Sequence, residues 1–275
     1  MTARPPVPTP FRSSASPPRA AGEVWRFRSL IGHLMVRNLK VKYQRSVLGF
    51  LWTLLNPLAT VAVLIVVFTH IVRIPVVDYW AFLLSGYFAW NFMYQVLTSA
   101  PLVLREHAAL HRSVAFPPES SLLAAAGSRL VEFAVELGIA LVLLVAFHHR
   151  AVPASYALLP VLVILQVLIA VGLALGIATV AAFYADIQHV IPILALMLFY
   201  VSPVFYPAAL VPETARHLYA ANPMAGMLTL YHNVLYEGAF PSASLLATTT
   251  LAAVVVWSAG YAIFNRHKPV FAELV

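Results

Sequence analysis

Apolar runs long enough to cross a lipid bilayer recur along this chain, and the first of them begins directly after a cluster of positive charge. The cluster holds four cations and no acidic residue: Arg37, Lys40, Lys42 and Arg45. The next stretch is predominantly apolar from Phe50 to Val72, and a membrane helix needs about 20 such residues. Cations beside a membrane helix usually lie in the cytoplasm, so this stretch also predicts how the chain is threaded.

Composition extends this interpretation to the whole chain. Its 275 residues are 61% hydrophobic and 10% charged, whereas soluble domains carry about 25% charged residues. The formal charge is +7, but nine of the seventeen Lys and Arg residues precede residue 46, beside the first apolar run. Anionic lipid is therefore the expected partner of this charge, and nucleic acid is not. The absence of cysteine excludes disulfides, thiolate metal sites and cysteine nucleophiles.

These features predict an all-α integral membrane protein that begins with two segments outside the bilayer. Residues 1–22 are rich in proline and are expected to form a disordered tail. Residues 23–48 are expected to form an amphipathic helix lying in the membrane interface. A transmembrane domain then covers residues 49–268, and residues 269–275 are expected to form a short cytoplasmic tail.

Six transmembrane helices fit within that domain, at about residues 50–72, 79–103, 122–147, 156–182, 190–205 and 244–264. Residues 206–242 are too broken by proline for one span and too apolar for a plain loop. They predict a re-entrant or surface-lying helical pair outside, between the fifth and sixth spans. Six spans place both termini in the cytoplasm, where the Lys and Arg excess then lies.

Aromatic and amide side chains gather on one face of the second span, at Tyr87, Trp90, Asn91 and Tyr94. Sugars stack on aromatic rings while their hydroxyls bond to amides and phenols, so this face is a candidate lining for a glycan path. An interfacial aromatic belt or a subunit contact would show the same pattern. The candidate path also includes residues of the first span, the fifth span and the segment directly after the fifth: Trp52, Tyr200, Phe205 and Tyr206.

Three ionisable residues share one face of the third span: Arg129, Glu132 and Glu136. A charge near the bilayer centre costs roughly 2.5–3.5 kcal/mol on insertion scales, so these groups should face protein or water. Arg129 and Glu132 are three residues apart and are expected to pair. A structural pair and a role in gating are both open. A further pattern, Gly172 and Gly176, predicts close helix packing within the chain.

The connection between the second and third spans is too charged to cross a membrane and must face water. Its candidate interaction residues are Arg105, Glu106, His107, His111, Arg112, Phe116, Pro117 and Glu119. His107 and His111 stand at ligand spacing, but without a third ligand at motif spacing we predict no metal site. The chain also has no phosphate-binding loop, because none of its three lysines follows a glycine. We therefore predict no catalytic residue, and no cofactor bound by this chain.

Several short motifs in order resemble the permeases of ABC-type polysaccharide exporters, which move O-antigen, capsule and teichoic-acid chains. Residues 42–57 read K-Y-x-x-S-x-L-G-x-L-W and then N-P, and residues 202–207 read S-P-V-F-Y-P. P-E at residues 212–213 and N-P at residues 222–223 come next. The resemblance covers about residues 24–268. It departs at Ala185, where the family usually has a basic residue.

The resemblance implies a homodimeric permease in the cytoplasmic (inner) membrane that extrudes a lipid-linked polysaccharide. ATP and Mg would be held by two copies of a separate ABC ATPase, docked on the connection that contains residues 105–119. The basic helix, through Arg37, Lys40, Lys42, Tyr43 and Arg45, would hold phosphate groups of lipid.

Two alternatives remain open. The first is an exporter of the same architecture that carries a drug or another lipid. The second is a membrane enzyme of glycan assembly, which is disfavoured because the outer acids Asp78, Glu213 and Glu237 are widely spaced.

Overall fold

The computed structural model describes residues 26–44, 48–106, 117–215, 219 and 222–274. Every regular element among these residues is a helix, which confirms the all-α prediction. The predicted tail at residues 1–22 lies outside the described residues, as does Arg45.

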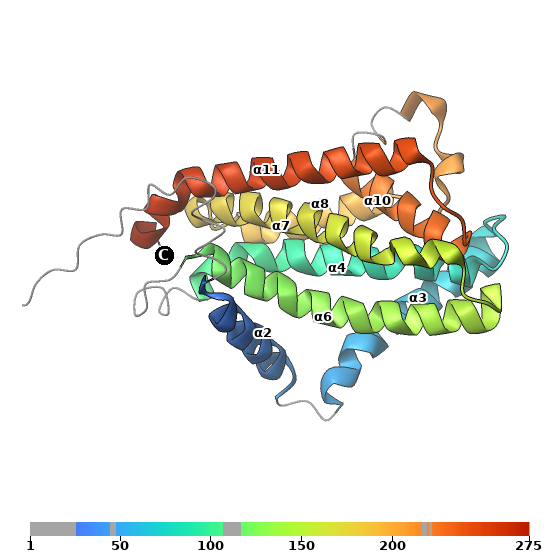
Figure 1. The fold of residues 1–275 in the computed structure, drawn as a ribbon, viewed down its shortest axis with the longest axis horizontal. Helices are drawn as coiled ribbons and strands as arrows, with labels where there is room; N and C mark the ends of the chain where they lie inside the picture. The colour runs from blue at the N-terminus through green and yellow to red at the C-terminus, as the bar shows by residue number, and fades with distance from the viewer. Residues whose placement is uncertain (1–25, 45–47, 107–116, 216–218, 220–221, 275) are drawn as a thin grey trace, which may run out of the picture.

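Four helices are long and apolar enough to cross a membrane: Gly49–Val72, Glu119–His149, Ala154–Phe183 and Ala243–Pro269. They contain α3 (Trp52–Val66), α6 (Glu119–Leu143), α7 (Leu159–Phe183) and most of α11 (Ala243–Leu274). Four of the expected spans therefore exist as apolar helices at the expected positions. Helices α6, α7 and α11 run alongside one another along the length of the molecule, whereas α3 crosses them obliquely (Figure 1).

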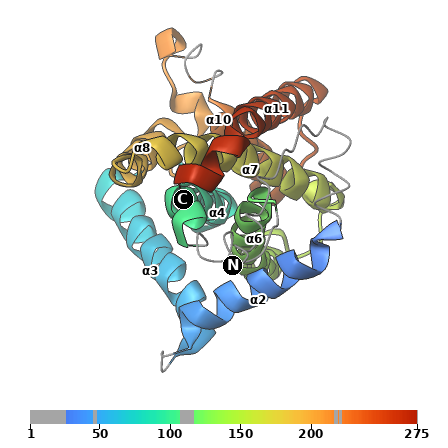
Figure 2. The same cartoon turned by 90° about the vertical axis from the view of Figure 1, so that its left-hand side faces the viewer.

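The second expected span is α4 (Tyr79–Glu106), a helix of 28 residues at the centre of the bundle. Viewed from one end, α4 lies inside a ring formed by α3, α8, α7 and α6 (Figure 2). It contacts all four, and α10 as well. This position explains its polar and aromatic sequence, because most of its side chains face protein instead of lipid.

The fifth expected span is the shorter helix α8 (Ile187–Val201). Its 15 residues extend about 22 Å, less than the roughly 30 Å of a bilayer core. The chain leaves the helix at Ser202, whose backbone is extended. Because Pro203 comes next, the residue before it is disfavoured in a helical conformation.

The described residues between 206 and 242 form short helical pieces, in agreement with the expectation of neither one span nor a plain loop. Turns at Ala208–Leu210 and Glu213–Ala215 precede α10 (Pro223–Tyr231) and a π-helical turn at His232–Tyr236. Asn222 caps α10, because its Oδ1 accepts the Met224 N–H at 2.9 Å. Helix α10 is buried against α4, α7 and α11.

Helix α2 (Arg28–Tyr43) crosses the bundle obliquely. It lies at the same end of the molecule as the C-terminal end of α11 (Figure 1). It packs on α6 with Leu34 buried, while Val36 and Val41 are exposed. The helix therefore rests on protein along one side, in addition to any surface it offers to lipid.

Helix α11 continues to Leu274, so the predicted tail after Lys268 is helical. Near its end, the Lys268 Nζ donates to Glu119 Oε1 at 2.8 Å, and both side chains are nearly buried. This pair joins the last helix to the first turn of α6.

The opposite end of the bundle is joined by polar contacts around Tyr236. The Tyr236 hydroxyl donates to the Val77 carbonyl at 2.6 Å, and its ring stacks on His148. His148 pairs with Asp78 at 2.8 Å through Nδ1 and contacts the Tyr236 carbonyl through Nε2. Loops that are far apart in the sequence are therefore tied together there.

Glycines allow α7 and α11 to approach closely. A Cβ atom on Gly172 would lie 2.6 Å from the Trp257 Cα, and one on Gly260 would collide with the Gly172 carbonyl oxygen. A Cβ on Gly176 would meet nothing within 4 Å. The predicted close packing at Gly172 within the chain is confirmed, but its partner is Gly260, and Gly176 takes no part.

Gly260→Ala is expected to destabilise the protein by about 1–3 kcal/mol, because the added methyl group has no room beside Gly172. Gly176→Ala is the matched control, since it adds the same methyl group in open space and should leave the melting temperature unchanged or raise it. Thermal unfolding of the detergent-purified variants measures both. Equal melting temperatures for Gly260→Ala and the parent protein would contradict the close contact.

Candidate functional site

A cavity of about 840 Å³ lies between α3, α4 and α8; we call it the groove. Its lining includes all four of the aromatic and amide residues expected on α4, together with Trp52 of α3: Tyr87, Trp90, Asn91 and Tyr94. Sequence reasoning missed other polar groups in the same wall: Thr53, Asn56, Thr60 and Gln95. The first three recur at helical spacing within an apolar run, a signal that the sequence does contain.

The rings of the groove are not equally accessible. Trp52 is 52% exposed and Tyr94 38% exposed, whereas Trp90 is 4% exposed. Trp90 packs beside Phe199 of α8, with ring centroids 5.7 Å apart. Trp52 and Tyr94 can therefore present ring surface to a ligand, while Trp90 mainly supports the wall.

The remaining predicted path residues, Tyr200, Phe205 and Tyr206, do not line the groove. They form an aromatic cluster where α8 ends, with the Phe205 ring 5.9 Å from Tyr200 and 5.0 Å from Tyr206. The Tyr206 hydroxyl donates to the Tyr200 carbonyl at 3.1 Å. Burial raises the pKa of Tyr206 above its ordinary value. These contacts fix the chain as it leaves α8.

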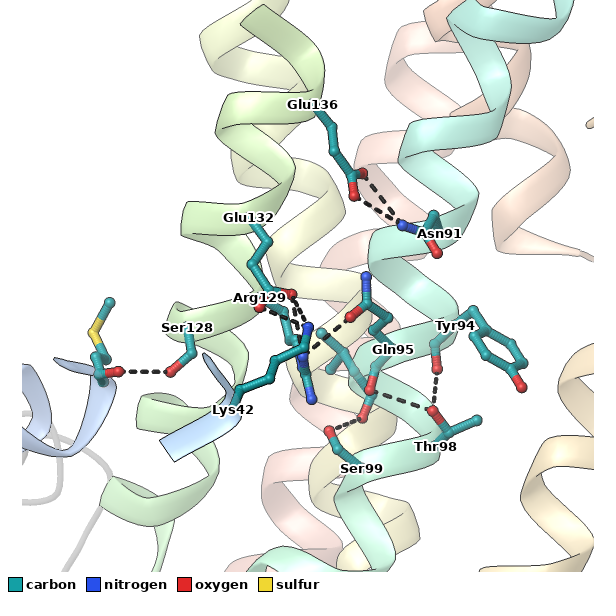
Figure 3. A network of polar contacts seen from close by, with 12 residues as sticks. Lys42, Asn91, Tyr94, Gln95, Thr98, Ser99, Ser128, Arg129, Glu132 and Glu136 are labelled. Carbon is teal, nitrogen blue, oxygen red and sulfur yellow. Dashed lines mark hydrogen bonds and ion pairs between the residues drawn. The ribbon is translucent and has the colours of Figure 1, made fainter. Parts of the chain in front are cut away.

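Glu132 is held by two cations from different helices (Figure 3). The predicted pair with Arg129 is confirmed, with Nη1 3.1 Å from Glu132 Oε2. Lys42 of α2 was not expected there, and its Nζ donates to both carboxylate oxygens at 2.8 and 2.9 Å. Arg129 Nη1 also donates to Gln95 Oε1 of α4 at 3.1 Å. The network therefore joins α2, α4 and α6.

Glu136 lies one turn further along α6 and meets the groove through Asn91. The Asn91 Nδ2 donates to both carboxylate oxygens of Glu136, at 3.0 and 3.3 Å. Glu136 is 1% exposed, so the carboxyl group faces protein, as the cost of placing it in lipid requires. The amides of Asn91 and Gln95 thus face the ionisable residues of α6, whereas the Tyr94 ring projects away from them, as Figure 3 shows.

A second cavity, of about 430 Å³, lies between α2, α4 and α6; we call it the inner cavity. Its charged lining residues are Arg37, Lys42, Glu106, Arg129 and Glu132. Burial lowers the pKa of Lys42 from its ordinary value of 10.5, and its hydrogen bond with Glu132 acts in the opposite direction.

Helix α2 is held on α6 by two further contacts near the inner cavity. The Ser128 hydroxyl lies 3.3 Å from the Met35 carbonyl and 2.8 Å from the Ala124 carbonyl of its own helix, and it can donate to either one. The absence of a side chain at Gly127 leaves room for the Met35 side chain, whose Sδ would lie 2.8 Å from a Cβ there. Lys40 and Arg37 are exposed on the same helix, and its last residue is Tyr43.

The predicted docking segment falls largely outside the described residues, which exclude His107, His111, Arg112 and Phe116. Helix α4 carries the chain through Arg105 to Glu106, which is exposed. Pro117 and Glu119 are buried instead, and Glu119 pairs with Lys268. Both residues therefore pack within the bundle where α6 begins. Among the described residues no group of three or more His, Asp or Glu could hold a metal ion.

The described residues therefore define a multi-pass helical membrane protein with a polar groove among its helices and a cationic cavity beside it. A family model described as ABC-2 type transporter matches residues 29–236. Since that match covers most of the sequence, the chain belongs to the ABC-2 type transporter family.

Curated relatives agree with the family predicted from sequence motifs. Over 261 residues the chain is 30% identical to the O-antigen export system permease protein RfbA of Myxococcus xanthus, covering 94% of this chain and 99% of that protein. It is 25% identical to the RfbA protein of Klebsiella pneumoniae, covering 87% and 92%. The polysialic acid transport protein KpsM of Escherichia coli is 20% identical, covering 86% and 92%. The recognition of an ABC polysaccharide exporter permease is confirmed.

Proposed function

We propose that this chain is the membrane subunit of an ATP-driven exporter that carries a lipid-linked polysaccharide across the cytoplasmic membrane. The groove is the observation that supports this most directly. Its wall combines exposed rings, Trp52 and Tyr94, with amides, Asn56 and Gln95, in a part of the molecule where lipid contact would call for aliphatic side chains. Rings offer stacking surface to sugars and amides bond their hydroxyls, so the groove suits a glycan better than an apolar drug.

The membrane arrangement we propose has six crossings, with α4 and α8 added to the four apolar helices. The 28 residues of α4 extend about 42 Å, which exceeds the bilayer core. Helix α8 would cross outward from the inner loop that precedes it, the re-entrant α10 would lie in the outer half, and α2 would lie at the inner surface. Both termini would then be cytoplasmic, with Arg37 and Lys40 exposed to anionic headgroups.

Single cysteines are expected to report this arrangement, because the chain has none of its own. Val77→Cys and Phe240→Cys, at residues that are 79% and 63% exposed, should react with a membrane-impermeant maleimide in intact spheroplasts. Tyr184→Cys, at a residue 66% exposed between α7 and α8, should react only after the membrane is permeabilised. Labelling of Tyr184→Cys in intact spheroplasts would overturn the orientation.

The working assembly we propose is two copies of this chain with two copies of an ABC ATPase, which would hold ATP and Mg. The family supports a partner ATPase, since ABC-2 type transporters are the membrane subunits of ATP-driven systems. Closure of the ATPases would push on two parts of this chain, the segment that comes after α4 and helix α2. Helices that move as rigid bodies would then open a path between the subunits along the groove.

An ATPase subunit is expected to co-purify with the full chain from its native host. Scrambling residues 107–116 should remove that subunit and its ATPase activity. Pro117 and Glu119 should be kept in the scrambled variant, because both are buried and Glu119 pairs with Lys268. Tyr184→Ala, on an exposed loop elsewhere, is the control and should retain the subunit. A chain that purifies alone and without ATPase activity would favour the membrane-enzyme alternative.

Trp52→Leu and Tyr94→Leu are each expected to slow polysaccharide export about five-fold, because a lost aromatic contact is worth about 1 kcal/mol. Phe147→Leu is the matched control, since Phe147 is 70% exposed and lies outside the groove. Export is measured as surface glycan per cell at equal amounts of membrane protein. If both groove variants export at the rate of Phe147→Leu, the groove is not the glycan path.

A further inference from the structure

The groove and the inner cavity share two residues, Lys42 and Arg129. These cations stand where a route from the inner side of α2 would enter the membrane groove. Their side chains remain 36% and 25% exposed, whereas Glu132 behind them is 1% exposed. Both positive groups therefore reach both cavities, whereas Glu132 lines the inner cavity alone and has almost no exposed surface.

The geometry around Glu132 is that of a bound anion. Its two oxygens accept two hydrogen bonds from the Lys42 ammonium, at 2.8 and 2.9 Å, and one from the Arg129 guanidinium at 3.1 Å. Ammonium and guanidinium groups form such charge-assisted bonds with carboxylate and phosphate alike. Two cations against one carboxylate also leave one positive charge in the network.

We propose that Lys42 and Arg129 form a binding site for a lipid-linked phosphate at the entrance to the groove, and that Glu132 is an internal counter-ion that occupies the site when it is empty. This rests on the proposed function as a lipid-linked glycan exporter. The phosphate arrives through the inner cavity, replaces Glu132 as partner of the two cations, and leaves the attached glycan facing the groove.

Three cations and two acids line the inner cavity, so its lining carries one net positive charge. Arg37 adds a positive charge on the inner-cavity side, and Glu106 is the other acid in that lining. Towards the groove, Glu136 is engaged by the amide of Asn91 at 3.0 Å. A phosphate that replaces Glu132 in the inner cavity therefore meets three cations and one further acid, Glu106.

A purely structural role for Glu132 makes the opposite prediction. If the carboxylate serves only to hold α2 on α6, neutralising it weakens that contact and confers no gain in anion binding. If it competes with a phosphate, neutralising it vacates the cations and tightens phosphate binding. Glu132→Gln separates these two roles because it keeps the size of the side chain and removes its charge.

The experiment uses the full chain, purified with its ATPase partner and placed in phosphatidylcholine nanodiscs. Native mass spectrometry measures the binding of a C55 polyprenyl pyrophosphate, with uncharged polyprenol of the same length as a reference. We expect Glu132→Gln to bind the pyrophosphate on the order of tenfold more tightly, and Lys42→Gln or Arg129→Gln on the order of tenfold more weakly. Binding of polyprenol should not change.

Arg266→Gln is the matched control, because Arg266 is an exposed cation on α11 that lines neither cavity. Its pyrophosphate affinity should equal that of the parent protein. Phosphatidylglycerol serves as a second probe. If it binds as tightly and shows the same pattern across the variants, the site recognises phosphate of ordinary membrane lipid; if it binds weakly, the carrier lipid is the ligand.

Weaker or unchanged pyrophosphate binding in Glu132→Gln would overturn the proposal. Should Arg129→Gln fail to elute as a single species, Lys42→Gln carries the same test from a partly exposed side chain. Co-purification of the ATPase is scored on the same samples. If the ATPase is present and the phosphate site fails, only this inference is lost; if no ATPase is present, the proposed function fails first.

Discussion

Glu132 and Glu136 lie on one face of a helix that crosses the membrane, and exposure of either carboxylate to lipid would be costly. The bundle is arranged so that both face protein. Glu136 meets the Asn91 amide of α4, and Glu132 meets Arg129 on its own helix and Lys42 from α2. The central position of α4 and the seat of α2 on α6 both satisfy this requirement.

Helix α2 therefore has two roles that an amphipathic sequence alone would not combine. Its cations Arg37 and Lys40 are exposed, while Lys42 and the Met35 carbonyl bind α6. Because Lys42 also lines both cavities, the contact that holds the helix in place is the same one that borders the groove. The same contact therefore forms the entrance to the groove and attaches α2 to α6.

One group of helices near the groove is well packed, and the two helices that close the groove are less tightly packed. Helices α7 and α11 meet at Gly172 and Gly260, and α10 is buried against both. Helix α3 has α4 as its main partner among the long helices, and α8 is only 15 residues long. These are the two helices that close the groove opposite α4. A firmly packed group of helices beside two less tightly packed helices is the arrangement expected where one part of a protein moves against another.

Local patterns were enough to predict several features of this protein. Apolar length located four membrane helices, a three-residue spacing paired Arg129 with Glu132, and the small residue Gly172 indicated close helix packing. The short motifs at residues 42–57 and 202–207 were sufficient to indicate the family. Each of these features depends on residues within a few helical turns of one another, so the periodicity and spacing of residues along the chain are enough to predict it.

The contacts that build the candidate site lie beyond that range. Lys42 and Glu132 are 90 residues apart, and Glu119 faces Lys268 across 149 residues. The cluster of Tyr200, Phe205 and Tyr206 lies outside the groove because the chain leaves α8 at Ser202. The rings on either side of Ser202 then pack against one another. The sequence by itself determined that this chain enters a membrane and which side chains cannot face lipid. Only the tertiary structure decided which partners meet them, because pairing across the bundle depends on how whole helices pack and not on spacing along any one of them.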